Sequence, residues 1–432
     1  MIEDGGARPA GSAALALRGW PLLVVLAGIQ FSNAMDFVIM MPLGPRYQRE
    51  LDISPQQFGI VVSAYPLAAC LSGLLAALVI DRFDRKRALL TLFAGFIAGT
   101  LLCGLASDYG MLFAGRFVAG MFGGLLGAVV LAIIGDVFHE HRRGLATGVV
   151  TSGFGLATIA GIPLGLTLAQ ELGTGSPFIA LACFSAGTLV LAAVFLPSFR
   201  HHLDGLNASN SGGSTMSPLS FKEVVTRPAH LRAYALTMTL MFGSFTLFPY
   251  LPTFLIVNVG WQEADLRWMY LCGGLAVLAT SALFGRLADR FGKLRVFRVL
   301  VLAAVPAILV LTNLGPTSLL ATLPLTTLFI VLTSSRWVPA LALITASARP
   351  AYRGSFMTVN SSMQQLGMGL AALVAGALLH QAKPDQPIEG FGLAGAVACA
   401  ATLVSVYLAG RLRIVDDKAA VEVLAAPADT AA

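Results

Sequence analysis

Charged residues are scarce in this sequence. Only 12% of its 432 residues are Asp, Glu, Lys or Arg, whereas 56% are hydrophobic and the mean hydropathy is +0.79. A soluble chain carries about 25% charged residues, and half that number cannot cover a surface that faces water. The composition therefore excludes an ordinary soluble protein and a disordered chain, and it favours a protein whose solvent is lipid.

Paired cysteines and metal-ligand spacings are missing as well. The five cysteines all fall in apolar stretches, which is typical of small buried hydrophobic side chains. We expect no metal site, no cofactor and no enzyme activity. The pair Asp81 and Asp84 has a spacing that could hold Mg²⁺, but basic residues crowd it. An intramembrane enzyme therefore stays a remote alternative.

Long apolar runs dominate what is present. A helix needs roughly 20 apolar residues to cross a bilayer, and lipid permits no open strand edge. The sequence predicts an all-α membrane protein with twelve transmembrane helices, at about 20–43, 56–80, 88–106, 111–135, 145–169, 177–197, 233–257, 267–287, 297–314, 318–346, 354–379 and 391–410.

The basic residues between these spans fix an expected orientation. Of the 28 Lys and Arg residues, 22 fall on the side that holds both termini, and four fall on the opposite side. Because Lys and Arg concentrate on the cytoplasmic side, we expect both termini in the cytoplasm and a multi-pass protein of a cytoplasmic (inner) membrane.

The chain divides into two similar halves. Residues 198–232 hold the longest polar stretch, with the linker sequence LNASNSGGSTMS. We expect an N-terminal tail (1–18), a six-helix half (19–197), this cytoplasmic linker, a second six-helix half (233–410) and a C-terminal tail (411–432). The halves echo each other, since Asp81 and Asp289 both follow a span in a DRF sequence, 208 residues apart. A duplicated bundle of this kind is typical of transporters, with the substrate bound between the halves.

One carboxyl group lies well inside a span. Asp36 is about seven residues from the end of span 1, and Arg116 is about five residues from the same end of span 4. We expect them at similar depth and close together. They form either a static ion pair or a proton-coupling pair, since burial and a nearby guanidinium act in opposite directions on a carboxyl group's proton affinity.

Other polar and aromatic side chains in the spans are candidate substrate ligands. Arg336 has no acidic neighbour in its half and binds either an anionic or polar substrate group or backbone carbonyls. Aromatic rings with a few hydrogen-bonding groups suit a partly apolar ligand, although such residues also pack helices together. The complete set of candidates is Gln30, Asn33, Phe242, Thr246, Tyr250, Arg336, Asn360 and Gln364.

Several motifs give the chain a family resemblance. Residues 77–86 (ALVIDRFDRK) and 285–293 (GRLADRFGK) are similar to the loop signature G-x-L-A-D-R-x-G-R-K, the first copy without its two glycines. Residues 116–120 (RFVAG) match R-x-x-x-G of span 4, and 155–165 (GLATIAGIPLG) resemble a relaxed span 5 antiporter signature. The chain thus resembles the major facilitator superfamily, and most of all its twelve-span drug:proton antiporter branch with the sugar-efflux relatives.

The resemblance implies residue roles and a function. It implies a proton-coupling role for Arg116 with Asp36, and a role in the conformational switch for Asp81, Arg82, Arg85, Asp289 and Arg290. We expect Gly155, Gly161 and Gly165 to allow close helix packing and Pro163 to bend span 5. The expected function is proton-coupled efflux of a drug, sugar or amphipathic metabolite by a monomer that binds no nucleic acid. The alternative is proton-coupled uptake.

Overall fold

The computed structural model describes residues 11–76, 84–196, 224–348, 353–383 and 385–412. Because lipid offers no hydrogen-bond partner to backbone N–H and C=O groups, the apolar runs fold as helices. The helices of the first half are α1 Gly11–Ile39, α2 Gly44–Glu50, α3 Pro55–Ala76, α4 Arg85–Gly104, α5 Tyr109–Val137, α6 Glu140–Leu156, the π-helix η2 Ala157–Gly161, α7 Ile162–Leu172 and α8 Ser176–Phe195.

The second half has the same plan. Its elements are α11 Pro228–Phe245, α12 Leu251–Phe254, the π-helix η3 Leu255–Val259, the 3-10 turn η4 Glu263–Asp265, α13 Leu266–Phe291, α14 Lys293–Thr312, α15 Leu319–Ser335, α16 Trp337–Ala346, α17 Arg353–Leu378 and α18 Phe391–Gly410. Taken together with the first half, these elements trace the twelve expected crossings within the described residues. The predicted fold is confirmed.

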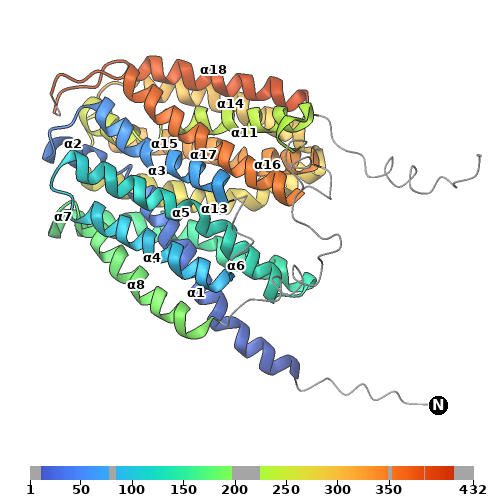
Figure 1. Cartoon of the computed structure of the whole chain (residues 1–432). Helices are drawn as coiled ribbons and strands as arrows, with labels where there is room; N and C mark the ends of the chain where they lie inside the picture. The colour runs from blue at the N-terminus through green and yellow to red at the C-terminus, as the bar shows by residue number, and fades with distance from the viewer. Residues whose placement is uncertain (1–10, 77–83, 197–223, 349–352, 384, 413–432) are drawn as a thin grey trace, which may run out of the picture.

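The two halves lie side by side along their helix axes (Figure 1). Helix α3 of the first half packs against α17 of the second, and α13 packs against η2 and α7. We call the end of the bundle with α2 and η4, at the left of Figure 1, the Arg46 end. The opposite end, where α4 and α14 begin, is the Arg85 end.

Ten helical segments of the described residues are long and apolar enough to cross a membrane. The other two crossings are the interrupted segment 228–259 and α17, which carries polar residues. Helix α1 starts at Gly11, although we expected residues 1–18 to be a tail. No proline lies between Gly11 and Pro21, so nothing stops the helix before its apolar part.

Prolines interrupt three of the crossings. Pro163 has no N–H to donate, and the turn before it widens into the π-helix η2, where the Ile162 N–H reaches the Ala157 carbonyl. Pro249 and Pro252 flank the break between α11 and α12. Pro339 follows the break between α15 and α16, which places Arg336 at the junction. Broken helices of this kind occur where a membrane protein lines a cavity or packs on protein.

Glycines allow the helices around the centre of each half to touch. A Cβ on Gly99 of α4 would lie 2.9 Å from the Ala119 Cβ of α5, and a Cβ on Gly120 would overlap the backbone of Tyr65 in α3. Small residues let helix backbones approach closely in a bilayer, where packing and hydrogen bonds drive association. Gly99 of α4 and Gly120 of α5 therefore let α3, α4 and α5 pack closely together.

Replacing Gly120 with Ala should destabilise the fold. The added methyl group must displace the Tyr65 backbone, and overpacking of this kind costs about 1–3 kcal/mol. Gly148→Ala on α6 is the matched control, because nothing lies within 4 Å of its Cβ position and Ala is the better helix former. Thermal unfolding in detergent should show a lower Tm for Gly120→Ala only. A Tm at or above the wild-type value for that variant would contradict the packing argument.

Candidate functional site

Asp36 and Arg116 form a fully buried ion pair near the Arg46 end. The exposed fractions of their side chains are 0% and 1%. Arg116 Nη1 lies 2.8 Å from Asp36 Oδ2, and the same nitrogen donates to the Asp36 backbone carbonyl at 3.0 Å. The structure therefore brings α1 and α5 into contact through the two charges that the sequence places at similar depth.

A third helix completes the surroundings of the carboxylate. Thr100 of α4 donates its hydroxyl to Asp36 Oδ1 at 2.9 Å, so both carboxylate oxygens accept a hydrogen bond. The guanidinium is less well satisfied, because Arg116 Nε is buried without a partner. A buried ion pair is stable only if its Coulomb attraction and hydrogen bonds offset the free energy lost when both groups leave water. Losing either charge of this pair would leave the other charge buried and uncompensated.

Tyr65 of α3 joins the pair to the polar face of α1. The Arg116 Cζ atom lies 4.7 Å from the centre of the Tyr65 ring, a cation–π contact. The Tyr65 hydroxyl donates to Asn33 Oδ1 at 2.5 Å. Asn33 and Gln30 are both half-buried, and the Gln30 Oε1 atom is buried without a hydrogen-bond partner. The predicted polar stripe of α1 therefore continues from the ion pair toward the Arg85 end and holds an unused acceptor.

Aromatic rings connect this region to the second half of the chain. The Phe37 ring lies 5.5 Å from the Tyr65 ring and 5.7 Å from Phe245 on α11, measured between ring centres. Phe245 contacts Phe248, which contacts Phe329 of α15. Phe37, Phe245 and Phe248 are half-buried. The interface between the halves is thus apolar and aromatic beside the Asp36–Arg116 pair.

Arg336 is buried in the second half and is held by hydroxyl groups. Its Nη2 donates to Ser244 Oγ on α11 at 2.9 Å and its Nη1 to Thr402 Oγ1 on α18 at 3.1 Å. We expected a substrate group or backbone carbonyls as its partners. The structure instead directs the guanidinium into the junction of α11 and α18, where a Cβ on Gly243 would lie 2.6 Å from the Thr402 hydroxyl.

The other candidate ligands of the second half differ in burial and in whether their polar groups already form hydrogen bonds. Asn360 of α17 is buried and accepts a hydrogen bond from Thr237 at 2.6 Å. The Thr246 hydroxyl donates to the Phe242 carbonyl at 2.6 Å. Phe242 and Gln364 are half-buried. Helix-to-helix and helix-internal hydrogen bonds thus occupy Asn360 and Thr246, whereas Gln364 and the Phe242 ring keep accessible surface.

Tyr250 contacts both halves. It is fully buried, and its hydroxyl lies 3.0 Å from the Ala372 carbonyl of α17 and 3.2 Å from the Pro55 carbonyl at the start of α3. Gly59 and Gly376 leave the space that this ring needs. We predicted a ligand contact for Tyr250. Its hydroxyl is engaged with backbone across the interface, so the structure gives this residue a role in closing the Arg46 end.

Further polar contacts join the halves at that end. Glu263 of η4 forms ion pairs with Arg46 and Arg49 of α2, at 2.7 Å for Arg46. We call these three residues the Glu263 cluster. In addition, Gln56 Nε2 donates to the Leu379 carbonyl at 2.7 Å. These polar contacts between the halves all lie at the Arg46 end.

Three glycines toward the Arg85 end have free space beside them. Nothing lies within 4 Å of a Cβ placed on Gly144 or Gly148 of α6, nor of one on Gly285 of α13. The two halves still touch on the way to this end, because a Cβ on Gly73 of α3 would lie 2.9 Å from the Ser362 hydroxyl of α17.

The predicted switch residues fall into two groups. Asp81 and Arg82 lie outside the described residues. Arg85 forms an ion pair with Asp136 of α5 at 2.6 Å, within its own half. Asp289 and Arg290 are exposed at the end of α13.

The span 5 motif has an uneven packing role. A Cβ on Gly161 or Gly165 would press on side chains of α1, the nearest at 2.6 Å from Met35 Sδ and 2.7 Å from Ile39 Cδ1. Gly155 has no neighbour within 4 Å of its Cβ position, so it does not provide the close packing that we predicted for it. Its place on the open part of α6 explains the difference.

Sequence reasoning missed two residues of the site and the Glu263 cluster. Thr100 and Tyr65 touch Asp36 and Arg116, yet a threonine or a tyrosine in an apolar span is common. The only signal was depth, because Thr100 lies four residues before the end of α4, at the level of Asp36. Glu263 was one of several loop acids, and nothing in the sequence pairs it with α2.

Comparison with known proteins identifies the family. The pattern of the Major Facilitator Superfamily matches residues 26–372 and 233–428. A probable sugar efflux transporter of Helicobacter pylori (strain G27) is 26% identical over 361 residues, 80% of this chain and 89% of that protein. The uncharacterized MFS-type transporter YwfA of Bacillus subtilis (strain 168) is 26% identical over 397 residues, 90% of this chain and 92% of that protein.

Solved structures share the fold. A crystal structure of the nucleoside transporter NupG superimposes with a TM-score of 0.68 at 11% identity, over 92% of this chain and 99% of that one. A peptide transporter POT structure gives the same TM-score at 15% identity, over 90% and 94% of the two chains. The twelve-crossing architecture and the extent of the sequence match lead to one conclusion: this chain belongs to the Major Facilitator Superfamily and is a multi-pass membrane transporter.

Proposed function

We propose that this transporter exports a small molecule across a cytoplasmic membrane in exchange for protons, and that Asp36 carries the proton. The observation that carries the proposal is the buried contact of Asp36 with Arg116 and Thr100. A carboxylate in a membrane span is costly and usually functional. In the proposed orientation both termini are cytoplasmic, so the Arg46 end faces outward.

The proposed coupling uses the balance within this pair. With Asp36 ionised, the guanidinium has a counter-charge and α1 is tied to α5. Protonation removes the charge that binds Arg116 and frees the α1–α5 contact. Phe37 follows Asp36 directly and touches Phe245 of the other half, so a shift of α1 acts on the interface between the halves.

The proposed cargo contacts lie along the same interface. Gln30 supplies an unpaired buried acceptor, and Asn33 and Gln364 supply further hydrogen-bonding groups. The rings of Phe37, Phe242 and Phe245 supply apolar surface. Such a mixture suits a sugar, an amphipathic metabolite or a drug-like molecule. A probable sugar efflux transporter among the relatives agrees with this cargo class.

Alternating access requires that the two ends open in turn. The Glu263 cluster, Tyr250 and Gln56 join the two halves at the Arg46 end and would hold that end closed. In our proposal this is the state that takes up cargo from the cytoplasm. A proton crossing a potential of 100 mV supplies about 2.3 kcal/mol, enough for roughly fiftyfold accumulation by the rule of 1.4 kcal/mol per tenfold.

Asp36→Asn should uncouple transport from protons. The amide cannot exchange a proton, so accumulation driven by a pH gradient should fall to background, at least tenfold below wild type. The measurement uses purified protein in liposomes, with a sugar or amphipathic dye that a growth screen of overexpressing cells has identified as cargo. Exchange of labelled for unlabelled cargo should persist, since it needs binding and access change only.

Glu171→Gln is the control, because it removes an exposed carboxyl group at the same end of the bundle. It should leave gradient-driven transport unchanged. Full gradient-driven activity in Asp36→Asn would refute the proton role. Cargo entering rather than leaving when the pH gradient is imposed would show uptake in place of export.

Glu263→Gln should favour opening of the Arg46 end. The substitution removes both ion pairs between α2 and η4. Because the side chains are 20–36% exposed, the pairs contribute about 1 kcal/mol or less, which permits a population shift of up to roughly fivefold. Spin labels on Gln57 and Lys383, exposed residues of the two halves at this end, report the change as a larger share of long distances.

The labelled protein also carries Cys183→Ser, since Cys183 is an exposed native thiol. Glu389→Gln is the control, as an exposed carboxyl group at the same end outside the Glu263 cluster. Identical distance distributions for Glu263→Gln and Glu389→Gln would show that the cluster does not hold this end closed.

A further inference from the structure

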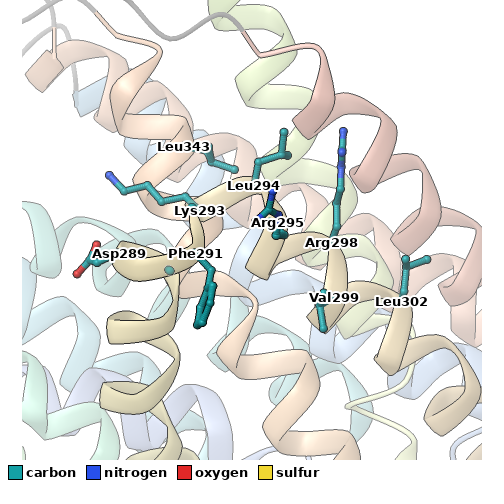
Figure 2. Close-up of a pocket in the computed structure, with 11 residues that line it drawn as sticks. Asp289, Phe291, Lys293, Leu294, Arg295, Arg298, Val299, Leu302 and Leu343 are labelled. Carbon is teal, nitrogen blue, oxygen red and sulfur yellow. The ribbon is translucent and has the colours of Figure 1, made fainter.

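A basic pocket lies at the Arg85 end, away from the interface between the halves (Figure 2). It has a volume of about 680 Å³ and is formed where α13 turns into α14. Three cationic side chains line it, namely Lys293, Arg295 and Arg298. Asp289 lines it as well, so the pocket has a formal charge of +2. Transport as described above uses none of these three cations.

The three cations have no ion pair or side-chain hydrogen bond to any part of the chain that the structure describes. Arg298 reaches toward α18, where its Nη2 would lie 2.9 Å from a Cβ on Gly410. Close cations repel each other, so this arrangement is stabilised by an external anion.

The residues of α14 that line the pocket change from basic to apolar along the helix. Val299 lies four residues after Arg295, and Leu302 lies four after Arg298, so these side chains share one broad face of the helix. Val299 is 62% exposed and Leu302 is 54% exposed, although both are apolar. With a rise of 1.5 Å per residue, Leu302 lies about 6 Å further along the axis than Arg298, toward the middle of the bundle.

Figure 2 shows the same order in space. In this view Lys293 extends to the left and Arg298 extends upward, whereas the side chains of Phe291 and Val299 point downward. Phe291 is 48% exposed. Cations at the membrane boundary with apolar side chains one turn deeper match the order of an anionic headgroup and its acyl chains. Basic pockets between membrane helices bind such headgroups.

We propose that this pocket binds an anionic phospholipid of the adjoining leaflet, with the phosphate on Arg295, Arg298 and Lys293 and the acyl chains against Val299 and Leu302. A soluble phosphate would use the cations but not the apolar face, which is why the lipid is favoured. With Asp289 beside the headgroup, the net charge of +2 is still enough to bind a monoanionic phosphate. Phosphatidylglycerol has a single charge and fits the pocket.

The test measures binding of dioleoyl phosphatidylglycerol to the full-length chain in detergent, by native mass spectrometry. The double substitution Arg295→Gln/Arg298→Gln should weaken binding about thirtyfold, at about 1 kcal/mol per basic residue and 1.4 kcal/mol per tenfold. The Lys double substitution at the same positions should restore it. Dioleoyl phosphatidylcholine should bind the wild-type chain at the level of the glutamine variant.

Arg87→Gln/Arg142→Gln is the matched control, since it removes two exposed charges at the same end of the other half and should keep phosphatidylglycerol affinity. An equal loss in the control would overturn the proposal in favour of unspecific charge attraction. Val299→Ser/Leu302→Ser should also weaken lipid binding. If it does not, and millimolar sn-glycerol 3-phosphate displaces the lipid fully, the pocket is a soluble-anion site and the lipid proposal fails. Gel filtration verifies that each variant is folded.

Discussion

The structure depends on one costly interaction, the contact between a carboxylate and a guanidinium inside an apolar bundle. Asp36 and Arg116 are both excluded from water, so each is tolerable only beside the other. This requirement fixes the depth of α1 against α5 and draws in the Thr100 hydroxyl from α4. Three helices are thereby positioned by one pair of charges, and the aromatic interface to the second half begins at the next residue, Phe37.

Two glycines, Gly99 and Gly120, allow the close helix packing around the Asp36–Arg116 pair. The helices around the ion pair lie close together. Gly99 lets α4 approach α5 and Gly120 lets α5 approach α3, because any side chain on them would meet the neighbouring helix. The RFVAG sequence therefore combines a charge with the space that the charge needs. Its arginine and its glycine act on different neighbours, α1 and α3, but they hold the same cluster together.

The sequence was sufficient to predict the helix crossings and the depth of charged residues within them. It was not sufficient to predict the direction of individual side chains, for a physical reason. The twelve crossings follow from apolar run length, and the approach of Asp36 to Arg116 follows from depth along two antiparallel spans. Side-chain direction does not follow from depth. Tyr250 and Arg336 were therefore read as possible ligands, although one bonds to backbone across the interface and the other to Ser244 and Thr402. The break between α11 and α12 sets the direction of Tyr250, and the break between α15 and α16 sets that of Arg336.

The two halves of the duplicated bundle differ in the groups that hold their buried arginines. Asp36 and Ser244 are 208 residues apart, the same offset as Asp81 and Asp289, and each accepts a hydrogen bond from the buried arginine of its own half. One half thus holds its arginine with a group that can exchange a proton, and the other holds its arginine with hydroxyls that cannot. Under the proposed mechanism only the first half responds to protons. The second half then serves as the surface against which α1 moves, with Phe245 opposite Phe37.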